Sequence, residues 1–420
     1  MSQSDPPAPP KQADPAAARL VSLDAYRGFI MLAMVSGGFG FAKIVEDLTE
    51  AGQPVSQAWR ILAYQFSHVE WTGCGFWDLI QPSFMFMVGV AMPYSLASRL
   101  KRGEGIGRIY AHTLWRSLLL IVLGIFLISN WYPQTRFSFV NVLTQIGLGY
   151  PLVFLLLGRG LRVQLATLAV ILVGYWLAFA LYPLPEAGFS IPGLPAGDST
   201  QQFSGLFAHW NKHTNAAAAF DRWFLNLFPQ QEPYHFNKGG YQTLNFIPSM
   251  ATILLGVMAG ERLRQDGSAG EKLRWLVVAG ALCLAAGAML NQTLCPSVKR
   301  IWTPSWALFS SGWTFWMLAG FYAAIDITGW KRWALPLVVV GMNSIAMYSM
   351  AQLLKPWVTK TYNIHLGYLL SEPESVNDQG IATYDLFAGT YGPLWQSLVV
   401  LFTLWAVCGW MYRRKIFLKI

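Results

Sequence analysis

Charged residues are scarce in this sequence. Only 12% of its 420 residues are Asp, Glu, Lys or Arg, while 54% are hydrophobic. Soluble globular chains carry about 25% charged residues, so this deficit argues against an ordinary soluble domain and indicates a lipid environment. The net charge of +9 does not indicate nucleic-acid binding, because the basic residues fall in short gaps between apolar runs instead of gathering on one soluble face.

Several signature motifs are missing as well. Four cysteines are present, and no Cys-x-x-Cys pair occurs, which argues against zinc-ribbon and thioredoxin-like sites. No Walker A run occurs, which argues against ATP-driven transport. Cys74 and Cys295 fall near the predicted outer face, where a disulfide between them is one open alternative.

The chain is expected to divide into a short tail and one membrane domain. Residues 1–19 are rich in Pro, Ala and Ser and have no apolar run, which predicts a disordered cytoplasmic tail without the parts of a signal peptide. Residues 20–420 are then a single transmembrane domain, whose first helix is expected to act as its own insertion signal.

Long apolar segments predict the fold class. A bilayer core needs about 20 apolar residues per helix, and ten segments meet this need. The predicted fold is therefore all-α, a polytopic transmembrane helical bundle of about ten helices. The segments are 27–45, 76–98, 113–131, 139–158, 163–182, 244–261, 274–291, 305–326, 334–353 and 393–412.

Lysine and arginine set the predicted orientation. With the N-terminus inside, 20 of the 30 Lys and Arg residues fall on the inner side and 10 on the outer side, as the positive-inside rule requires. Ten helices then place both termini in the cytoplasm. Three long outer loops follow, 46–75, 183–243 and 354–392, and loops of this length are commonly functional.

The predicted inner end of the first helix carries a charged pair. Asp24 and Arg27 are three residues apart and share a helix face. One interpretation is a helix cap with an interfacial anchor, and the other is a site for an anionic cytoplasmic ligand.

The start of the second helix carries the strongest candidate for chemistry. Asp78 lies inside an apolar run, and an intramembrane carboxylate suggests function, with structural pairing to Lys or Arg as the alternative. His68 is the best candidate base, because its ordinary pKa lies near neutral pH; the alternative is a solvated loop histidine. His209 and His213 have a metal-binding spacing if they are helical, but no third ligand is evident, so no metal is expected.

Polar residues also interrupt the ninth segment. Asn343 and Ser344 fall near mid-membrane, where polar side chains need partners. They either form hydrogen bonds between helices or line a ligand channel.

These pieces, in this order, resemble the membrane acetyltransferase family of heparan-alpha-glucosaminide N-acetyltransferase and its bacterial relatives. The resemblance covers about residues 19–412. It rests on Ser22-Leu23-Asp24 with Arg27-Gly28, His68 with Trp71-Thr72-Gly73, Asp78-Leu79-Ile80 with Pro82 and Phe84–Gly89, Lys299 with Trp302-Thr303, and Gly341-Met342-Asn343-Ser344.

The resemblance implies a transfer across the membrane. Acetyl-CoA would bind from the cytoplasm, and an amino sugar or glycan acceptor from the outer side. The essential histidine of the family matches His68, which either becomes acetylated or acts as a base. Asp78 would orient a partner or hold the second helix in register, and Asn343 or Ser344 would stabilise the oxyanion. The expected donor-binding residues are Asp24 and the inner-face cations Arg27, Arg99 and Arg116, since such cations suit CoA phosphates. The acceptor contacts expected from the resemblance are Glu70, Trp71, Lys299 and Trp302.

The absence of an organelle signal favours a bacterial inner membrane, although the family also has lysosomal members. The resemblance implies an enzyme that is often a homodimer. Two departures from the pattern of the family concern the active site and the acceptor. Ser36-Gly37-Gly38-Phe39-Gly40 stands where the family has an Asn late in helix 1, and Asn237-Lys238-Gly239-Gly240 replaces an acidic run. The alternative function is a transporter or carrier of a sugar or lipid-linked glycan, which suits the glycine-rich first helix.

Overall fold

The computed structural model describes residues 20–186, 189–195, 202–376 and 382–418, so the predicted tail 1–19 lies outside the described residues. Its elements are α1 (Val21–Val35), α2 (Phe41–Glu50), α3 (Gln57–Gln65), α4 (Ile80–Lys101), α5 (Ile106–Ser129), α6 (Val142–Phe154), α7 (Leu161–Ala180), α8 (Ala216–Phe224), α9 (Phe246–Arg264), α10 (Ala269–Thr293), α11 (Pro304–Phe321), α12 (Leu335–Gly341), α13 (Ser344–Tyr362), α14 (Tyr368–Leu370), β1 (Pro373–Val376), β2 (Ala382–Tyr384) and α15 (Gly392–Arg413).

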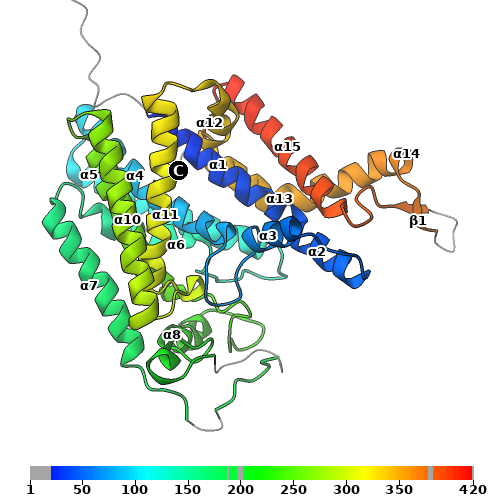
Figure 1. Cartoon of the computed structure of the whole chain (residues 1–420), viewed down its shortest axis with the longest axis horizontal. Coiled ribbons are helices and arrows are strands. Elements are labelled where there is room, and N and C mark those ends of the chain that lie inside the picture. The colour runs from blue at the N-terminus through cyan, green and yellow to red at the C-terminus, as the bar shows by residue number, and fades with distance from the viewer. Residues whose placement is uncertain (1–19, 187–188, 196–201, 377–381, 419–420) are drawn as a thin grey trace, which may run out of the picture.

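The chain is a multi-pass helical membrane protein. Within the described ranges, eight helices are long and apolar enough to cross a membrane, and a ninth crossing is made if α12 and the α13–α14 segment, bent by 67°, count as one broken span. The predicted segment 139–158 is the shorter helix α6. Eight of the ten predicted segments each fall on one helix, and the segments 27–45 and 334–353 each fall on two helices joined by a break. The prediction of a polytopic helical bundle is confirmed (Figure 1).

The first predicted helix is interrupted. α1 ends at Val35, and Gly37 to Gly40 then adopt left-handed backbone angles before α2 begins. Three of these four residues are glycines, which reach positive φ without the steric cost of a Cβ. The break therefore follows from the glycine-rich sequence that replaces the expected Asn.

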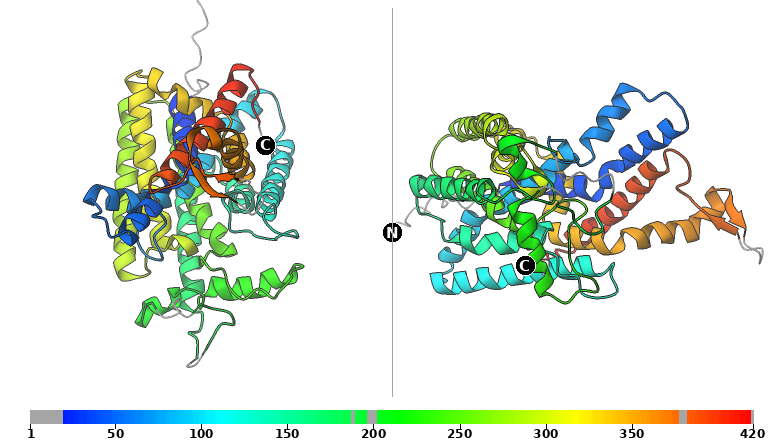
Figure 2. Two further views of the ribbon diagram at one scale, coloured as in Figure 1. Left: turned by 90° about the vertical axis from the view of Figure 1, so that its right-hand side faces the viewer. Right: turned by 90° about the horizontal axis from the view of Figure 1, so that it is seen from below.

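The long loops contain more helix than the sequence predicts. α3 lies in the predicted loop 46–75, and α8 lies in 183–243. The prediction of a loop over 354–392 is wrong for its first part, since α13 continues to Tyr362 and further helical turns reach Leu370. This arm, with α14 and the antiparallel β1–β2 hairpin, projects away from the main bundle (Figures 1 and 2).

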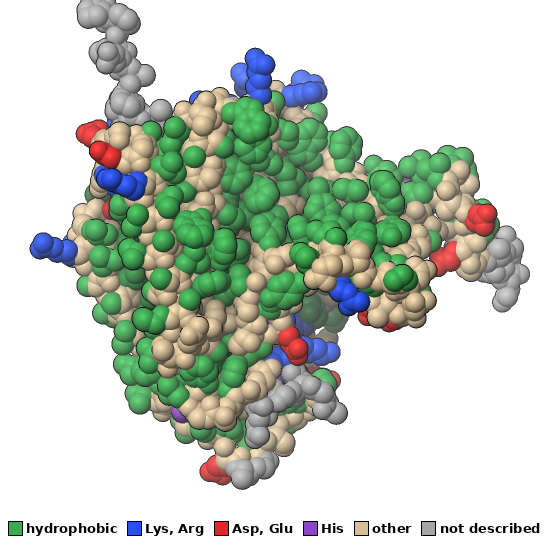
Figure 3. All heavy atoms as spheres, viewed as in Figure 1, with side chains coloured by type: hydrophobic (Ala, Val, Ile, Leu, Met, Phe, Trp, Pro, Cys, Tyr) green, Lys and Arg blue, Asp and Glu red, His purple; other side chains and the backbone are tan. Residues whose placement is uncertain are grey.

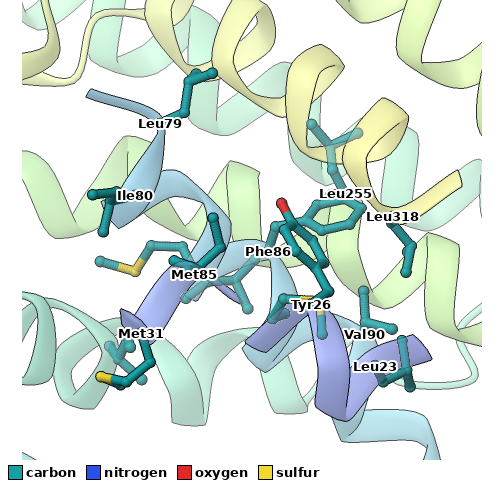
Figure 4. Packing of buried hydrophobic residues seen from close by; sticks show 14 of the residues in the cluster. Leu23, Tyr26, Met31, Leu79, Ile80, Met85, Phe86, Val90, Leu255 and Leu318 are labelled. Carbon is teal, nitrogen blue, oxygen red and sulfur yellow. The ribbon is translucent and has the colours of Figure 1, made fainter. Parts of the chain in front are cut away.

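The core forms where α1, α4, α9 and α11 meet (Figure 4). Tyr26 of α1 is fully buried and donates a 2.9 Å hydrogen bond to the Ser83 hydroxyl of α4. Its ring stacks on Phe321, with centroids 5.3 Å apart. Satisfying the phenol inside the core avoids the cost of an unpaired buried hydroxyl and fixes α1 against α4.

Both ends of the described chain meet at one end of the bundle. α1 approaches α12 so closely that a Cβ on Gly341 would lie 1.9 Å from the Asp24 carbonyl oxygen. Asn343 in turn donates to the carbonyl of Ile416 in the C-terminal segment. The two ends therefore lie on the same side, and the cytoplasmic location of that side stays a prediction.

Glycines let α4 and α9 pack backbone to backbone. A Cβ on Gly89 would lie 1.9 Å from the Ile253 carbonyl oxygen, and one on Gly256 would lie 2.1 Å from that of Phe86. Small residues at such crossings are a common means of helix association in membranes.

We expect Gly89→Ala to lower the midpoint of thermal unfolding, because overpacking costs about 1–3 kcal/mol when the neighbour cannot yield, and here the neighbour is backbone. Gly174→Ala in α7 is the matched control, since a methyl group at that position would meet nothing within 4 Å. Thermal unfolding in detergent compares the two. Equal midpoints would contradict the close packing.

The surface agrees with a membrane protein. Large apolar side chains such as Val170, Leu282 and Phe402 are exposed on the outside of the bundle. Apolar side chains cover most of the face in Figure 3, and charged side chains lie mainly at its edges. This distribution matches a hydrocarbon-facing band with polar rims.

Candidate functional site

A histidine and an aspartate from one loop form the centre of the site. His68 lies between α3 and α4, and its Nδ1 is 2.8 Å from Oδ1 of Asp78. Asp78 stands in the 3₁₀ turn that opens α4, and its Oδ2 accepts from the backbone N–H groups of Val69, at 3.3 Å, and Gly75, at 3.1 Å. A carboxylate at a helix start is stabilised by such unpaired N–H groups, so the local fold places Asp78 and, through it, His68.

Lys299 completes the cluster from a distant part of the chain. Its Nζ lies 3.2 Å from Asp78 Oδ1 and 3.0 Å from His68 Nδ1. The Lys299 and Asp78 side chains are 4% and 1% exposed, while His68 is 41% exposed. The buried carboxylate and ammonium therefore neutralise each other, and the imidazole alone reaches outward.

The hydrogen-bond network offers His68 two tautomers. Asp78 is an acceptor, and its Oδ1 faces both Lys299 and the Nδ1 of His68. A proton on Nδ1 lets both groups donate to the carboxylate, and an unprotonated Nδ1 would instead accept from Lys299, whose Nζ lies 3.0 Å away. In the first tautomer His68 presents the lone pair of Nε2, as a general base requires.

Electrostatics favours the neutral imidazole. Burial lowers the pKa of His68, and the cations Lys299 and Arg300 lower it further against the opposing effect of Asp78. Burial also lowers the pKa of Lys299 to about 8, so this lysine stays mostly protonated at pH 7. The site thus holds a neutral base beside a compensated ion pair.

Two loops are tied together to hold this cluster. Thr72 pairs with Val298 in an isolated antiparallel bridge, and Gly73 N–H donates to the Ser297 carbonyl at 3.4 Å. The 3₁₀ turn Lys299–Ile301 ends at Trp302, which has a left-handed φ of 47°. Non-glycine residues in this region cost energy and persist where the surroundings hold them, here to aim Lys299 at Asp78.

Arg300 is a residue of the site that the sequence analysis missed. Its Nη2 donates to the Val69 carbonyl at 3.2 Å, next to His68, and its Nη1 donates to the Gly239 carbonyl. It also lies over the ring of Tyr241, 5.6 Å from the centroid. Arg300 therefore joins the His68 loop to the Asn237–Gly240 segment, and its position next to Lys299 was the available signal.

The predicted acceptor contacts separate into two kinds. Trp71 and Trp302 are 5% and 1% exposed. Their indole N–H groups donate to the Trp210 carbonyl and the Thr252 hydroxyl. These rings hold the loops of the site in place. Glu70 is exposed, two residues along the chain from His68.

A second feature is a cavity of about 460 Å³ at the other end of the bundle. It brings together four of the predicted donor-binding residues, namely Asp24, Arg27, Arg99 and Arg116, together with Ser344. Arg27 lies 3.8 Å from Asp24, and Arg116 donates to the Tyr150 hydroxyl at 3.3 Å. The sequence analysis did not single out His112 and Tyr150, which also line it.

Asn343 does not lie with His68. Its amide donates to the Ile416 carbonyl at 3.0 Å and accepts from Leu418 N–H at 3.1 Å. These contacts commit both ends of the side chain to the C-terminal segment. Ser344 lines the cavity with Asp24 instead, so neither residue is brought to the His68 cluster to stabilise an oxyanion there.

The cysteines form no disulfide among the described residues, and the spaced histidines form no metal site there. Cys74 and Cys295 are both free thiols, and burial raises the pKa of Cys74 to about 12, so its thiol stays protonated. His209 and His213 do not share an α-helix. Within the described ranges, no three His, Cys, Asp or Glu side chains converge as a metal site.

No protein-family model matches the chain. Human heparan-alpha-glucosaminide N-acetyltransferase is 26% identical over 372 residues, which cover 79% of this chain and 52% of the relative. The mouse protein of the same name is 24% identical, covering 79% of this chain and 53% of the relative.

The resemblance to the heparan-alpha-glucosaminide N-acetyltransferase family is confirmed. The chain spans about half the length of the curated relatives it matches. A heparan-alpha-glucosaminide N-acetyltransferase, by its name, transfers an acetyl group to the amine of a glucosamine unit, a reaction that needs a base for the amine proton.

Proposed function

We propose that this chain is a membrane acetyltransferase. It moves an acetyl group from acetyl-CoA to an amino sugar or glycan on the opposite side of the membrane, with acetyl-CoA bound in the cavity lined by Arg27, Arg99 and Arg116, which we call the donor cavity. The observation that carries the proposal is the His68–Asp78–Lys299 cluster, which presents a neutral imidazole beside a buried ion pair. The similarity to two N-acetyltransferases supports the same chemistry. The proposed location is a bacterial inner membrane.

The proposed reaction assigns one role to each member of the cluster. The acceptor amine attacks the thioester carbonyl carbon, and Nε2 of His68 takes the amine proton as the N–C bond forms. The C–S bond then breaks, and the CoA sulfur leaves with that proton as a thiol. Asp78 holds the tautomer and stabilises the imidazolium that forms, as the acidic member of a catalytic triad does.

The donor cavity has a lining that suits acetyl-CoA. Its lining includes Arg27, Arg99 and Arg116, and guanidinium groups are well suited to phosphates. The cavity continues along α4 from Arg99 to Phe84, a separation of 15 residues or about 22 Å at 1.5 Å per residue. Asp78 follows six residues further, so an elongated thioester whose phosphates lie at Arg99 would extend toward His68.

We expect Arg99→Ala and Arg116→Ala each to weaken acetyl-CoA binding about tenfold or more. A hydrogen bond to a charged group contributes about 1.5–3 kcal/mol, and 1.4 kcal/mol is a factor of ten in affinity. Thermal shift on the detergent-solubilised full chain measures this, because a ligand that binds only the folded state raises its stability.

Arg162→Ala is the matched control for this test, since Arg162 is exposed in the first turn of α7 and does not line the cavity. It should keep the wild-type shift. A wild-type protein that is folded and shows no shift at millimolar acetyl-CoA would contradict the donor site.

A sugar or lipid-linked glycan carrier is the second candidate function. It is favoured by the broken helices, namely the left-handed break after α1 and the 67° bend between α12 and α13. Discontinuous helices are common at the substrate sites of transporters. A carrier should move its substrate in proteoliposomes without acetyl-CoA and should tolerate His68→Ala, whereas the acetyltransferase should fail both tests.

A further inference from the structure

A separate cavity lies between the projecting arm and the outside of the bundle, away from the site described above. It measures about 990 Å³. One wall is a face of α13 that presents Lys355, Thr359 and Lys360, continued by Asn363 in the turn that follows. The opposite wall is a face of α15 with Pro393, Gln396, Ser397 and Val400. The break in α1, at Gly37 and Gly40, and the hairpin residues Thr383 and Tyr384 complete the lining.

The charge of this cavity is one-sided. Its lining contains two lysines and no carboxylate among the described residues. Asp385 accepts hydrogen bonds from Asn363 and from the Phe387 N–H, and it does not line the cavity. Lys355 is half-buried, and an ammonium that leaves water without an acidic partner carries a desolvation cost.

Neutral polar groups surround these cations. Gln396 donates to the Thr359 hydroxyl at 3.1 Å and so links the two walls. The Lys355 ammonium reaches the break in α1, where a methyl group built on Gly37 would lie 2.8 Å from Nζ. Thr359 donates its own hydroxyl proton to the Lys355 carbonyl. The cavity therefore combines two positive charges with the Gln396 amide and the Ser397 hydroxyl as neutral donors, which is the chemistry of a site for an oxyanion.

The surroundings of the cavity point to the depth of lipid headgroups. Trp357, Tyr368, Tyr391 and Trp395 are all exposed on the same arm and at the start of α15. Exposed Trp and Tyr gather at membrane–water interfaces, where their rings are amphipathic. Lys355 and Lys360 lie on the predicted outer side of the membrane, so the positive-inside rule does not explain why two cations stand here.

We propose that this cavity binds a phosphate group, with the headgroup of an anionic phospholipid as the ligand. Lys355 and Lys360 pair with the phosphate, the hydroxyl and amide groups of the walls donate to it, and the acyl chains extend along the apolar surface of the arm. The proposal is independent of acetyl transfer, since it concerns none of the residues of the His68 cluster or the donor cavity.

The test uses the purified full-length chain in a neutral detergent with dioleoyl phosphatidylglycerol, dioleoyl phosphatidylcholine or inorganic phosphate as probes. Native mass spectrometry counts the bound lipid and thermal shift measures stabilisation. We expect wild-type protein to prefer phosphatidylglycerol over phosphatidylcholine. The double variant Lys355→Met/Lys360→Met should lose about tenfold or more of this affinity, and Lys355→Arg should keep most of it.

Lys43→Met is the matched control, because Lys43 is an exposed cation of α2 that pairs with Glu46 and Asp47 and lies outside the cavity lining. It should bind phosphatidylglycerol as wild type does. A lysine-dependent shift with inorganic phosphate as strong as that with phosphatidylglycerol would keep the phosphate site and assign it to a soluble ligand. Equal lipid binding by wild type and the double variant would overturn the proposal.

The stability of the lipid-free protein gives a second readout. Lys355 lies near the C-terminal end of α1, where a cation also stabilises the helix dipole. If Lys355 serves a ligand, Lys355→Met should keep or raise the unfolding midpoint without lipid, because it removes an uncompensated charge. A lowered midpoint would assign Lys355 to helix capping and overturn its role in the site.

Discussion

Replacement of His68 by alanine is expected to reduce acetyl transfer by about 10²–10⁴-fold, the usual contribution of a positioned general base. The side chain is 41% exposed, so its removal creates little cavity and the fold should persist. The donor cavity does not include His68, so the thermal shift with acetyl-CoA should equal that of wild type. The measurement pairs turnover on an amino-sugar acceptor with this shift.

His365→Ala provides the matched control, because His365 is also exposed and lies on the arm, outside the His68 cluster and the donor cavity. It should keep wild-type turnover. Full activity in His68→Ala would contradict the role of His68 as base. Loss of the acetyl-CoA shift in the same variant would show that the substitution acts through binding and not through the proton transfer.

The sequence predicts elements well where one local property decides them. Apolar length alone located the ten helical segments, because a bilayer imposes a minimum run on each. The arm beyond residue 353 was missed for the same reason, since Lys355 and Lys360 interrupt the apolar run while the helix continues. The helix presents a polar face to a cavity, and the length of an apolar run does not predict a helix of this kind.

The candidate site likewise has a local part that the sequence predicts and a distant part that it does not. His68 and Asp78 are ten residues apart, and the carboxylate at the start of an apolar run already singled them out. Lys299 lies 221 residues from Asp78, and only the family resemblance pointed to it. Trp71 and Trp302 show the limit of residue type as a guide, because an aromatic beside a site supports its loops as readily as it contacts a ligand.

Asn343 illustrates a further limit. Polarity near mid-membrane indicated a need for partners, and the structure supplies them from the C-terminal segment at Ile416 and Leu418. That segment follows the last helix, and its return to the bundle is a tertiary contact with no local signal. The same contact explains why the side chain is unavailable to the His68 cluster.

Opposite changes in the ion pair should move the pH dependence of acetyl transfer in opposite directions. The neutral form of His68 is the active base, so activity rises as pH passes its pKa. Lys299→Met removes a cation that lowers this pKa, so the pKa rises and the acid limb moves to higher pH. Asp78→Asn removes the group that favours the imidazolium, so the limb moves to lower pH.

The two variants should also differ in rate at the plateau. Asp78→Asn frees the imidazole tautomer and should lower kcat on the order of 10²-fold, while Lys299→Met keeps the Asp78–His68 hydrogen bond and should lose less. Each single variant leaves one buried charge without its partner, which costs about 3–5 kcal/mol of stability. Unfolding midpoints therefore accompany every pH profile.

The double variant Asp78→Asn/Lys299→Met separates these effects. It removes both charges, so it should recover stability relative to either single variant while keeping the low kcat of Asp78→Asn, because the carboxylate that stabilises the imidazolium is still missing. A purely structural ion pair predicts the reverse, with activity returning as stability returns. If the acid limb of the pH profile does not move in either single variant, the limb does not report the pKa of His68. The assignment of His68 as the base would then be contradicted.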